Sequence, residues 1–350
     1  MATKVESILL REKHVKFFMR CLSILPDRYE AYDSNRMTIC FFALSGLDLL
    51  DALDRIDSDK QSIIDWIYSL QVLPSSKELN ESPSKYCGFR GSKAAGAKSA
   101  ASIDDCPYDG GHLAMTYTAL ASLLILQDDF SRVHRSAIIQ SLKSLQRSDG
   151  SFSPMAFECE NDVRFIYCVC CISYMLNDWS GFDQEKAVDY IRNSQGYDFG
   201  IAQGPSMESH GGSTFCAVAS LFLMGRLHDA FAADKLEGLK RWCLLRQQTG
   251  FNGRPNKPVD TCYSFWVGAT LELLGCYDLI DRECNRGHLL AIQNSITGGL
   301  SKHFDTPPDV LHSYLGLSGL SLLSEPGLQE VDPALNISRR AVEHLHTTCW

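Results

Sequence analysis

A unit of roughly 50 residues recurs along the chain, and repeats of that length restrict it to stacked supersecondary units. Each unit ends one helix at a glutamine and continues into a second, more apolar helix. In all units but the first, a glycine-containing turn follows the glutamine. The glutamines are Gln71, Gln146, Gln195, Gln247 and Gln293. Because no strand pattern competes with this one, the chain is predicted to be all-α.

The second helix of each unit is apolar nearly all round, whereas the first carries charge on one face. A helix buried on two sides has the first of these patterns, so the second helices are predicted to form an inner ring inside an outer one. They are expected at His112 to Leu126, Val163 to Leu176, Ser213 to Leu227, Thr261 to Leu274 and Leu311 to Leu323. Such hairpins close into an α/α barrel, a toroid whose inner helices all begin at one end of a central funnel.

Residues 1–350 are predicted to form one domain. Three helices, at Ile8 to Leu25, Met37 to Leu50 and Gln61 to Val72, precede the other hairpins. The segment at about 75–107 is rich in Ser, Lys, Ala and Gly and has no apolar periodicity. It is therefore interpreted as a surface insertion, interrupted by one ordered turn at 87–91.

Charge and composition exclude several classes of protein. The net charge is -9 and no basic stripe occurs, which argues against a nucleic-acid partner. The longest apolar runs are too short to span a membrane. The chain starts without a signal-peptide pattern, and most of its 14 cysteines lie inside apolar helical runs. These features indicate a reduced, cytoplasmic protein.

A polar side chain able to take part in chemistry stands where each predicted inner helix begins. The residues are His112, Arg164, His210, Asp260 with Cys262, and His312. One histidine at such a place is ordinarily a helix cap, but five equivalent positions predict a shared site at the mouth of the funnel. If Asp260, Cys262 and His312 meet there, they form a three-ligand zinc site with one open position. That position suits a thiol, whose pKa zinc would lower.

A second group of residues suits a diphosphate. Arg254 and Lys257 lie in a loop stiffened by two prolines, which holds two cations at a set separation. His210 and the phenol of Tyr263 are expected nearby and would stabilise charge on a departing diphosphate. A thiolate next to such a pocket indicates S-alkylation.

These residues and the sequences around them resemble the β subunits of the protein prenyltransferases, most closely those of the type I geranylgeranyl branch. The resemblance covers nearly the whole chain and is carried by FFALSGL at 41–47, SHGGSTF at 209–215 and DVLHSY at 309–314. It implies an α/α barrel paired with a helical α subunit. It also implies one zinc ion per heterodimer, held by Asp260, Cys262 and His312, and a prenyl diphosphate whose chain lies down the funnel.

The resemblance also implies the substrates and their pockets. The diphosphate would contact His210, Arg254, Lys257 and Tyr263, and the isoprenoid would be walled by Thr38, Phe42, Tyr167 and Trp266. The protein substrate would end in a Cys-a-a-X box with Leu or Phe as X, as in Rho-family small GTPases. Its last residue would be held by His112, Met115, Arg164, Phe165 and Leu311.

Three positions bear on the subtype. The resemblance places Thr38 where farnesyl enzymes carry a tryptophan, so the funnel should admit five more carbons, worth roughly 4 kcal/mol at about 0.8 kcal/mol per buried CH₂. Lys302 stands where other branches carry a magnesium-binding aspartate, which implies catalysis without magnesium. Leu315 replaces an aromatic residue of relatives, which implies a softer pocket there.

Three alternatives stay open at this point. A farnesyl-specific β subunit is the nearest, and Thr38 and Lys302 count against it. An α/α-barrel glycosidase needs two acidic groups, whereas the predicted mouth offers one acid and several cations. A non-catalytic helical scaffold would bind no metal and would tolerate loss of Cys262.

Overall fold

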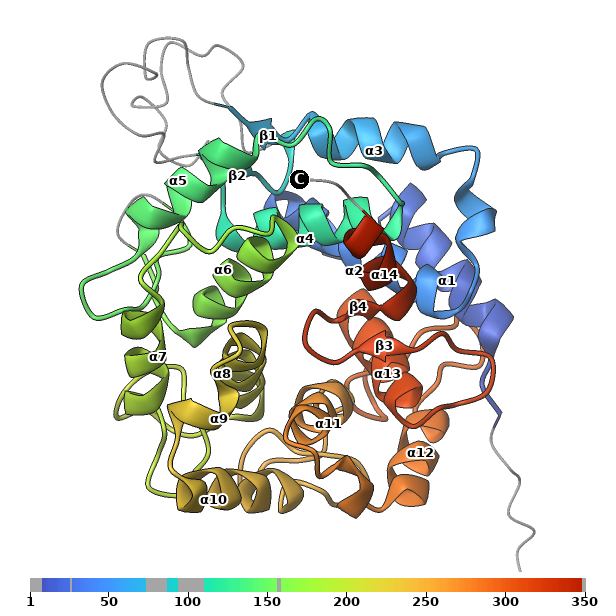
Figure 1. Cartoon of the computed structure of the whole chain (residues 1–350). Helices are drawn as coiled ribbons and strands as arrows, with labels where there is room; N and C mark the ends of the chain where they lie inside the picture. Colours follow the sequence, from blue (N-terminus) through green and yellow to red (C-terminus); the bar gives the residue numbers. More distant parts are fainter. Residues whose placement is uncertain (1–7, 26, 74–86, 94–109, 156–158, 348–350) are drawn as a thin grey trace, which may run out of the picture.

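The computed structural model describes residues 8–25, 27–73, 87–93, 110–155 and 159–347, and they form an α/α toroid (Figure 1). Six inner helices pack side by side, each on the next and the last on the first, around a central axis. They are α2 (Arg36–Leu49), α4 (Leu113–Ile125), α6 (Val163–Met175), α8 (Gly211–Leu223), α11 (Tyr263–Leu273) and α13 (Val310–Leu322). The sixth member of this ring is α2, which the sequence predicted only as a helix.

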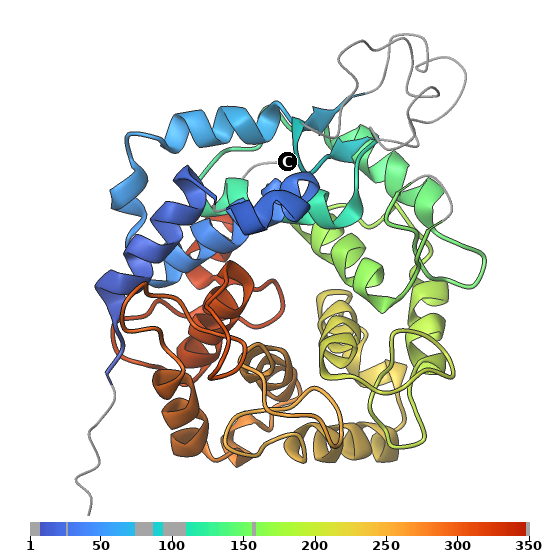
Figure 2. The same cartoon turned by 180° about the vertical axis from the view of Figure 1, so that it is seen from behind.

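Further helices surround this ring, as the view from behind also shows (Figure 2). They are α1 (Arg11–Ser23), α3 (Lys60–Tyr68), α5 (Arg135–Leu145), α7 (Gln184–Asn193), α10 (Ala233–Leu244) and α12 (Arg282–Ala291). Shorter helical pieces are η1 (Asp27–Asn35), η2 (Leu53–Ile56), α9 (Leu227–Ala230), η7 (Tyr277–Leu279) and the terminal α14 (Arg339–Thr347). The two rings confirm the predicted toroid.

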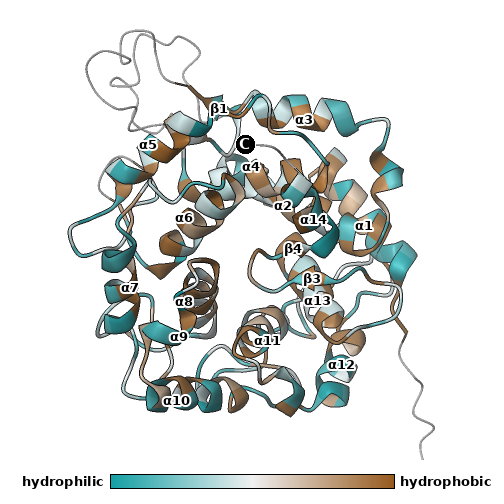
Figure 3. Ribbon diagram, viewed as in Figure 1, coloured by the Kyte–Doolittle hydropathy of each residue, from teal (hydrophilic) through white to brown (hydrophobic). Residues whose placement is uncertain are grey.

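Hydropathy explains why each helix takes its ring. In α4, every residue except Ala114 is buried, so no face of this helix is left for solvent. In α7, by contrast, only Ala187, Val188, Tyr190 and Ile191 are buried, and charged residues cover its other face. Figure 3 shows the result, with apolar residues concentrated on the inner helices and hydrophilic ones on the outside. The core therefore lies between the two rings and within the inner one.

The repeated glutamines fasten each hairpin to the next. The side chain of Gln146 accepts a hydrogen bond from the backbone N–H of Asp183 and donates one to its carbonyl, both at 2.8 Å. Gln247 makes the same pair of bonds with Asp281, at 2.9 and 2.7 Å. Asp183 and Asp281 cap the next outer helices, α7 and α12. The repeat thus carries its own connector, which is why the glutamine recurs.

The last glutamine closes the ring onto the start of the chain. Gln293 accepts from the backbone N–H of Leu10 at 2.8 Å and donates to the carbonyl of Ile8 at 3.1 Å. Its oxygen also lies 2.8 Å from Nε2 of the fully buried His14, whose Nδ1 accepts from the N–H of Gly299. The first and last repeats are joined by the same kind of bond as the others.

We expect Gln247→Leu to lower the free energy of unfolding by about 1–2 kcal/mol, because the N–H and C=O of Asp281 lose their partner. Urea unfolding measures the change. The matched control is Gln248→Leu, since this neighbouring glutamine is exposed and its side chain has no hydrogen-bond partner among the described residues. Equal effects of the two substitutions would show that the connector contributes nothing.

Short strands are the feature that the sequence missed. β1 (Gln71–Val72) pairs antiparallel with β2 (Gly88–Phe89), and β3 (Val331–Asp332) pairs with β4 (Ile337–Ser338). The predicted helix Gln61 to Val72 is therefore wrong at its end, since α3 stops at Tyr68. The ordered turn predicted at 87–91 contains β2, and most of the predicted insertion at 75–107 lies outside the described residues. Strands of two residues are too short to show alternation.

Two further sequence expectations can be compared with the structure. Most of the cysteines in the described part of the chain are buried. Within the same residues, no helix combines the length and the apolar character that crossing a bilayer requires.

Candidate active site

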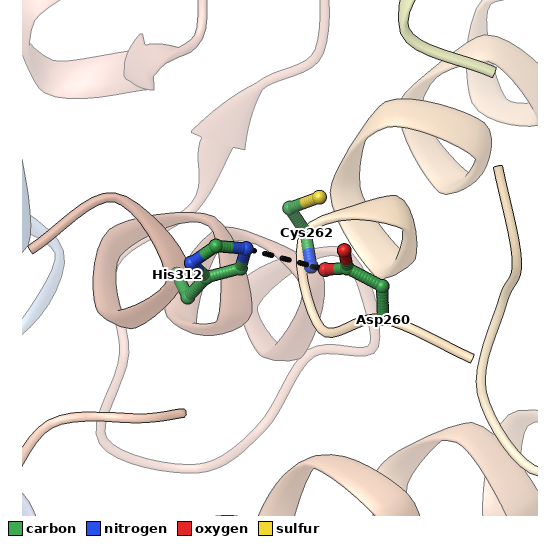
Figure 4. Close-up of side chains that lie close together, drawn as sticks. All are labelled: Asp260, Cys262 and His312. Atoms are coloured by element: carbon green, nitrogen blue, oxygen red, sulfur yellow. Dashed lines mark hydrogen bonds and ion pairs between the residues drawn. The ribbon is translucent and has the colours of Figure 1, made fainter. Parts of the chain in front are cut away.

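Three potential metal ligands meet where two neighbouring inner helices begin (Figure 4). Asp260 and Cys262 lie just before α11, and His312 lies in the first turn of α13. One ligand atom from each lies within 4.8 Å of the others, and Nε2 of His312 is 3.3 Å from Oδ1 of Asp260. Oxygen, sulfur and imidazole nitrogen are the donors that zinc prefers. The structure thus brings together residues 50 positions apart in the sequence, as the repeat predicted.

Backbone and carboxylate contacts orient these ligands. Asp309 caps α13 by accepting from the N–H of His312, and its other oxygen lies 2.7 Å from Nδ1 of the same residue. A carboxylate accepts, so Nδ1 carries a proton and Nε2 faces Asp260 and Cys262. Asp260 accepts in turn from the N–H of Cys262 at 3.1 Å. Sequence reasoning missed the role of Asp309, although an aspartate three residues before a helical histidine is a recognisable capping signal.

The protonation of this group opposes metal binding. Burial by itself lowers the pKa of His312, but hydrogen bonds with Asp260 and Asp309 outweigh it and raise the pKa to about 9. Burial by itself raises the pKa of Asp260, but the bonds from His312 and Cys262 outweigh it and lower the pKa to about 2. Burial and the carboxylate of Asp260 raise the pKa of the Cys262 thiol. A cation that binds here must therefore displace protons from His312 and Cys262.

We expect the apparent zinc affinity to rise about a hundredfold per pH unit between pH 6.5 and 9, because each bound ion releases one proton from each of these two residues. Competition with a zinc chelator across this range measures the slope. The substitution Asp309→Asn removes one of the carboxylates that raise the pKa of His312. The pH range over which the zinc affinity rises steeply should therefore end at a lower pH. An affinity independent of pH would contradict this account.

The residues predicted to hold a diphosphate form a second group beside the first. Tyr263 Oη lies 2.9 Å from His210 Nε2, and Nδ1 of His210 accepts from the N–H of Gly212. Nδ1 is thus an acceptor, so in neutral His210 the proton is on Nε2 and is donated to the tyrosine oxygen. The hydroxyl hydrogen of Tyr263 is then available to a ligand. Burial, followed by the nearby Arg254, lowers the pKa of His210, which favours this neutral form.

Close packing holds this group in place. Gly253 precedes the predicted cation Arg254, and a Cβ at Gly253 would lie 2.1 Å from the Tyr263 ring.

Arg254 pairs with the exposed Glu208 at 2.5 Å, and Lys257 is exposed on the same loop. Lys302, from the next repeat, places its Nζ 3.6 Å from Oδ2 of Asp260. Cations therefore flank the candidate metal ligands.

A cavity of about 710 Å³ opens beside His312 and Lys302. Four of the predicted pocket residues line it together: Thr38, Phe42, Met115 and Leu311. The hydroxyl of Thr38 contacts the Met115 sulfur at 3.4 Å, so residues predicted for the isoprenoid and for the peptide share one space. Tyr29, Tyr32 and Ile39 also line the cavity, and sequence reasoning missed them. The two tyrosines lie in η1, which has no apolar periodicity.

The other predicted pocket residues lie elsewhere around the funnel. Tyr167 and Trp266 are joined through Phe215, with ring centroids 5.2 and 4.9 Å from it, and neither lines the 710 Å³ cavity. Leu315 is fully buried and does not line it either.

The remaining mouth residues have local partners. His112 accepts from the N–H of Ala114 as a helix cap, and its ring contacts Phe165 at 6.2 Å. Arg164 lies 5.5 Å from the Phe165 ring, and its guanidinium pairs with Asp162 and Glu160 at 2.6 and 2.8 Å. A carboxylate ligand at Arg164 would compete with these two side chains.

Comparison with known proteins adds independent findings. A model of the family described as the prenyltransferase alpha-alpha toroid domain matches residues 9–337. The geranylgeranyl transferase type-1 subunit beta of Dictyostelium discoideum is 44% identical over 96% of this chain and 97% of its own length. The protein of the same name from Arabidopsis thaliana is 40% identical over 93% of this chain and 88% of its own. The protein farnesyltransferase subunit beta of Schizosaccharomyces pombe is 29% identical over 89% of this chain and 78% of its own.

A solved structure is also similar. Candida albicans protein geranylgeranyltransferase-I complexed with GGPP superimposes with a TM-score of 0.86 and 28% sequence identity. The match covers 97% of this chain and 98% of the other.

Proposed function

The chain belongs to the prenyltransferase alpha-alpha toroid family, and from this premise we propose that it is the catalytic β subunit of a type I protein geranylgeranyltransferase. It transfers a geranylgeranyl group from geranylgeranyl diphosphate to the cysteine of a C-terminal Cys-a-a-X box. The observation that carries the proposal is the convergence of Asp260, Cys262 and His312 next to Lys302, at an apolar cavity lined by Thr38.

The proposed reaction is an S-alkylation. Asp260, Cys262 and His312 would hold a zinc ion, which would lower the pKa of a substrate thiol so that its thiolate exists at neutral pH. The sulfur forms a bond to C1 of the prenyl chain as the bond between C1 and the diphosphate oxygen breaks. The electron pair of that bond leaves with the diphosphate.

Residues of this chain stabilise the departing diphosphate. His210 holds the Tyr263 oxygen so that the phenol hydrogen is available to a phosphate oxygen, and Arg254 and Lys257 supply positive charge. Lys302 lies beside Asp260 and lines the cavity, so its ammonium reaches the same region. A protein cation in this place supports transfer without magnesium.

We assign the pockets in the same way. The isoprenoid lies against Thr38, Phe42, Tyr167 and Trp266, and the last residue of the peptide, Leu or Phe, lies among His112, Met115, Arg164, Phe165 and Leu311. Arg164, whose partner Glu160 is exposed, helps to hold the terminal carboxylate through water. Protein substrates of this kind include Rho-family small GTPases.

The working enzyme is a heterodimer. The chain acts as one domain of residues 1–350 with a helical α subunit and one zinc ion per heterodimer, in the cytoplasm. The α subunit covers part of the toroid, so the isolated chain is expected to be inactive.

Co-expression with a candidate α subunit tests the proposal. We expect transfer from geranylgeranyl diphosphate to a peptide ending in Leu, lost on EDTA dialysis and restored by zinc without magnesium. Preferential farnesyl transfer to a peptide ending in Ser would favour the farnesyl alternative. A heterodimer without zinc or transfer would favour the non-catalytic scaffold.

A further inference from the structure

An ion pair with two accessible partners stands at the edge of the proposed diphosphate site. Glu208 lies two residues before His210, and its Oε2 is 2.5 Å from Nη1 of Arg254. The side chain of Glu208 is 61% exposed and that of Arg254 35% exposed, so a ligand can reach both. Lys257, the other cation of this loop, is exposed and has no ion partner among the described residues. One of the two loop cations assigned to the diphosphate is thus already paired with a carboxylate of this chain.

Backbone contacts hold both members of this pair on fixed supports. The N–H of Gly211 donates to the carbonyl of Gly253 at 2.8 Å, which joins the start of α8 to the loop that carries Arg254. The residue after Glu208 is fixed as well, because the hydroxyl of Ser209 donates to an aspartate carboxylate at 2.5 Å. The two side chains can therefore exchange partners while the backbone stays in place.

The charges of the pair act on the two residues that we assign to the leaving group. Burial lowers the pKa of His210, the guanidinium of Arg254 adds to this effect, and the carboxylate of Glu208 opposes it. Burial raises the pKa of Tyr263, and Arg254 opposes that rise. A diphosphate bound at these two residues would therefore lie in the field of both charges. The carboxylate would repel this anion and compete with it for the guanidinium.

The strength of the ion pair suits an exchange of partners. An exposed carboxylate–guanidinium pair contributes little free energy, because water screens the charges and both side chains lose freedom. A diphosphate carries more negative charge than a carboxylate, and one guanidinium can donate two parallel hydrogen bonds to it. The diphosphate should therefore displace Glu208 from Arg254, at a cost that weakens its binding severalfold.

We propose that Glu208 is a positioning residue of the diphosphate site. Its carboxylate holds Arg254 while the site is empty and gives the guanidinium up to the diphosphate of the prenyl donor. After transfer it competes for Arg254 again, which speeds the release of inorganic diphosphate. This inference rests on the proposed function. It assigns Glu208 to the binding and release of the leaving group, and no bond to the prenyl chain passes through it.

The test measures equilibrium binding of inorganic diphosphate to the heterodimer by calorimetry. The substitution Glu208→Gln nearly keeps the shape of the side chain and removes its charge. We expect the dissociation constant to fall about fivefold at low salt, the upper end for an exposed ion pair, and the rate of diphosphate release to fall similarly. A merely structural role of Glu208 predicts the opposite sign, because a loosened site binds the anion more weakly.

The substitution Glu208→Asp separates competition from repulsion. It keeps the negative charge, but its carboxylate is one methylene shorter and loses the contact with Arg254. We expect the dissociation constant for inorganic diphosphate to fall about twofold, between the values of the unmodified heterodimer and of Glu208→Gln.

The matched control is Glu185→Gln. Glu185 lies on the outer helix α7, is 68% exposed and pairs with Arg226 at the same distance of 2.5 Å. Its loss changes the net charge of the chain by the same amount as Glu208→Gln does. It should leave both diphosphate binding and transfer unchanged.

Three results would overturn the inference. The first is unchanged or weaker binding of inorganic diphosphate in Glu208→Gln. The second is unchanged binding in Glu208→Asp, which would mean that the contact with Arg254 has no effect. The third is equal tightening in Glu185→Gln, which would make net charge the cause. If the unmodified heterodimer binds diphosphate but transfers no prenyl group, the proposed function fails instead, and these binding comparisons still test Glu208.

Discussion

Replacing Cys262 with alanine should remove the bound zinc and lower kcat/KM for geranylgeranyl transfer by at least about a thousandfold. Asp260 and His312 would be left as the only protein ligands, and two ligands hold zinc weakly. The substrate thiol would then keep its ordinary pKa of about 8.5 and would be mostly protonated at neutral pH. Zinc content per heterodimer and transfer to a peptide ending in Leu measure the two effects.

The control for this substitution is Cys284→Ala. Cys284 lies on the outer helix α12, is half-buried and is not part of the candidate metal group. It should leave both zinc content and transfer unchanged. Wild-type turnover by a folded Cys262→Ala heterodimer would exclude a catalytic role for the group and favour the scaffold alternative.

Replacing Thr38 with tryptophan should reverse the choice of prenyl donor. Thr38 lines the 710 Å³ cavity and contacts Met115, so an indole there would fill space that we propose for the fourth isoprene unit. Five carbons at about 0.8 kcal/mol each correspond to roughly 4 kcal/mol, or about a thousandfold in relative kcat/KM. Competition between geranylgeranyl and farnesyl diphosphate for one peptide measures the ratio.

Thr38→Val is the matched control, because it removes the hydroxyl at nearly constant volume and should leave the donor ratio within about threefold of wild type. An unchanged ratio in a folded Thr38→Trp heterodimer would mean that the chain does not pass this position.

The repeat explains how the toroid was predictable from the amino-acid order. A glutamine before each turn and an apolar helix after it are local patterns, and both recur at a nearly constant spacing. A constant spacing places equivalent residues at equivalent heights on parallel inner helices. Asp260, Cys262 and His312 meet for this reason. Phe41 and Tyr314, each eight residues before the end of its inner helix, follow the same rule.

Other features depend on contacts between segments far apart in the chain. The hydrogen bonds between Leu10 and Gln293 and between Tyr117 and Leu335 join residues more than 200 positions apart. No periodicity in the sequence predicts such pairs, because they form only when the ring of helices closes. β1 and β2 were missed for a similar reason, since two-residue strands are stabilised by pairing and not by their own pattern.

The amino-acid order alone determined the class of fold, the ring positions of most helices and the set of residues at the funnel mouth, because each of these depends on helical periodicity and repeat spacing. Tertiary structure decided the role of each residue at the funnel mouth. The side chain of His112 caps its own helix, whereas Asp260 and His312 face each other. Tertiary structure also decided that Thr38 and Met115 share one cavity and that a turn at 334–336 accepts hydrogen bonds from three inner-helix tyrosines. These outcomes depend on side-chain directions and ring closure, which spacing along a chain does not specify.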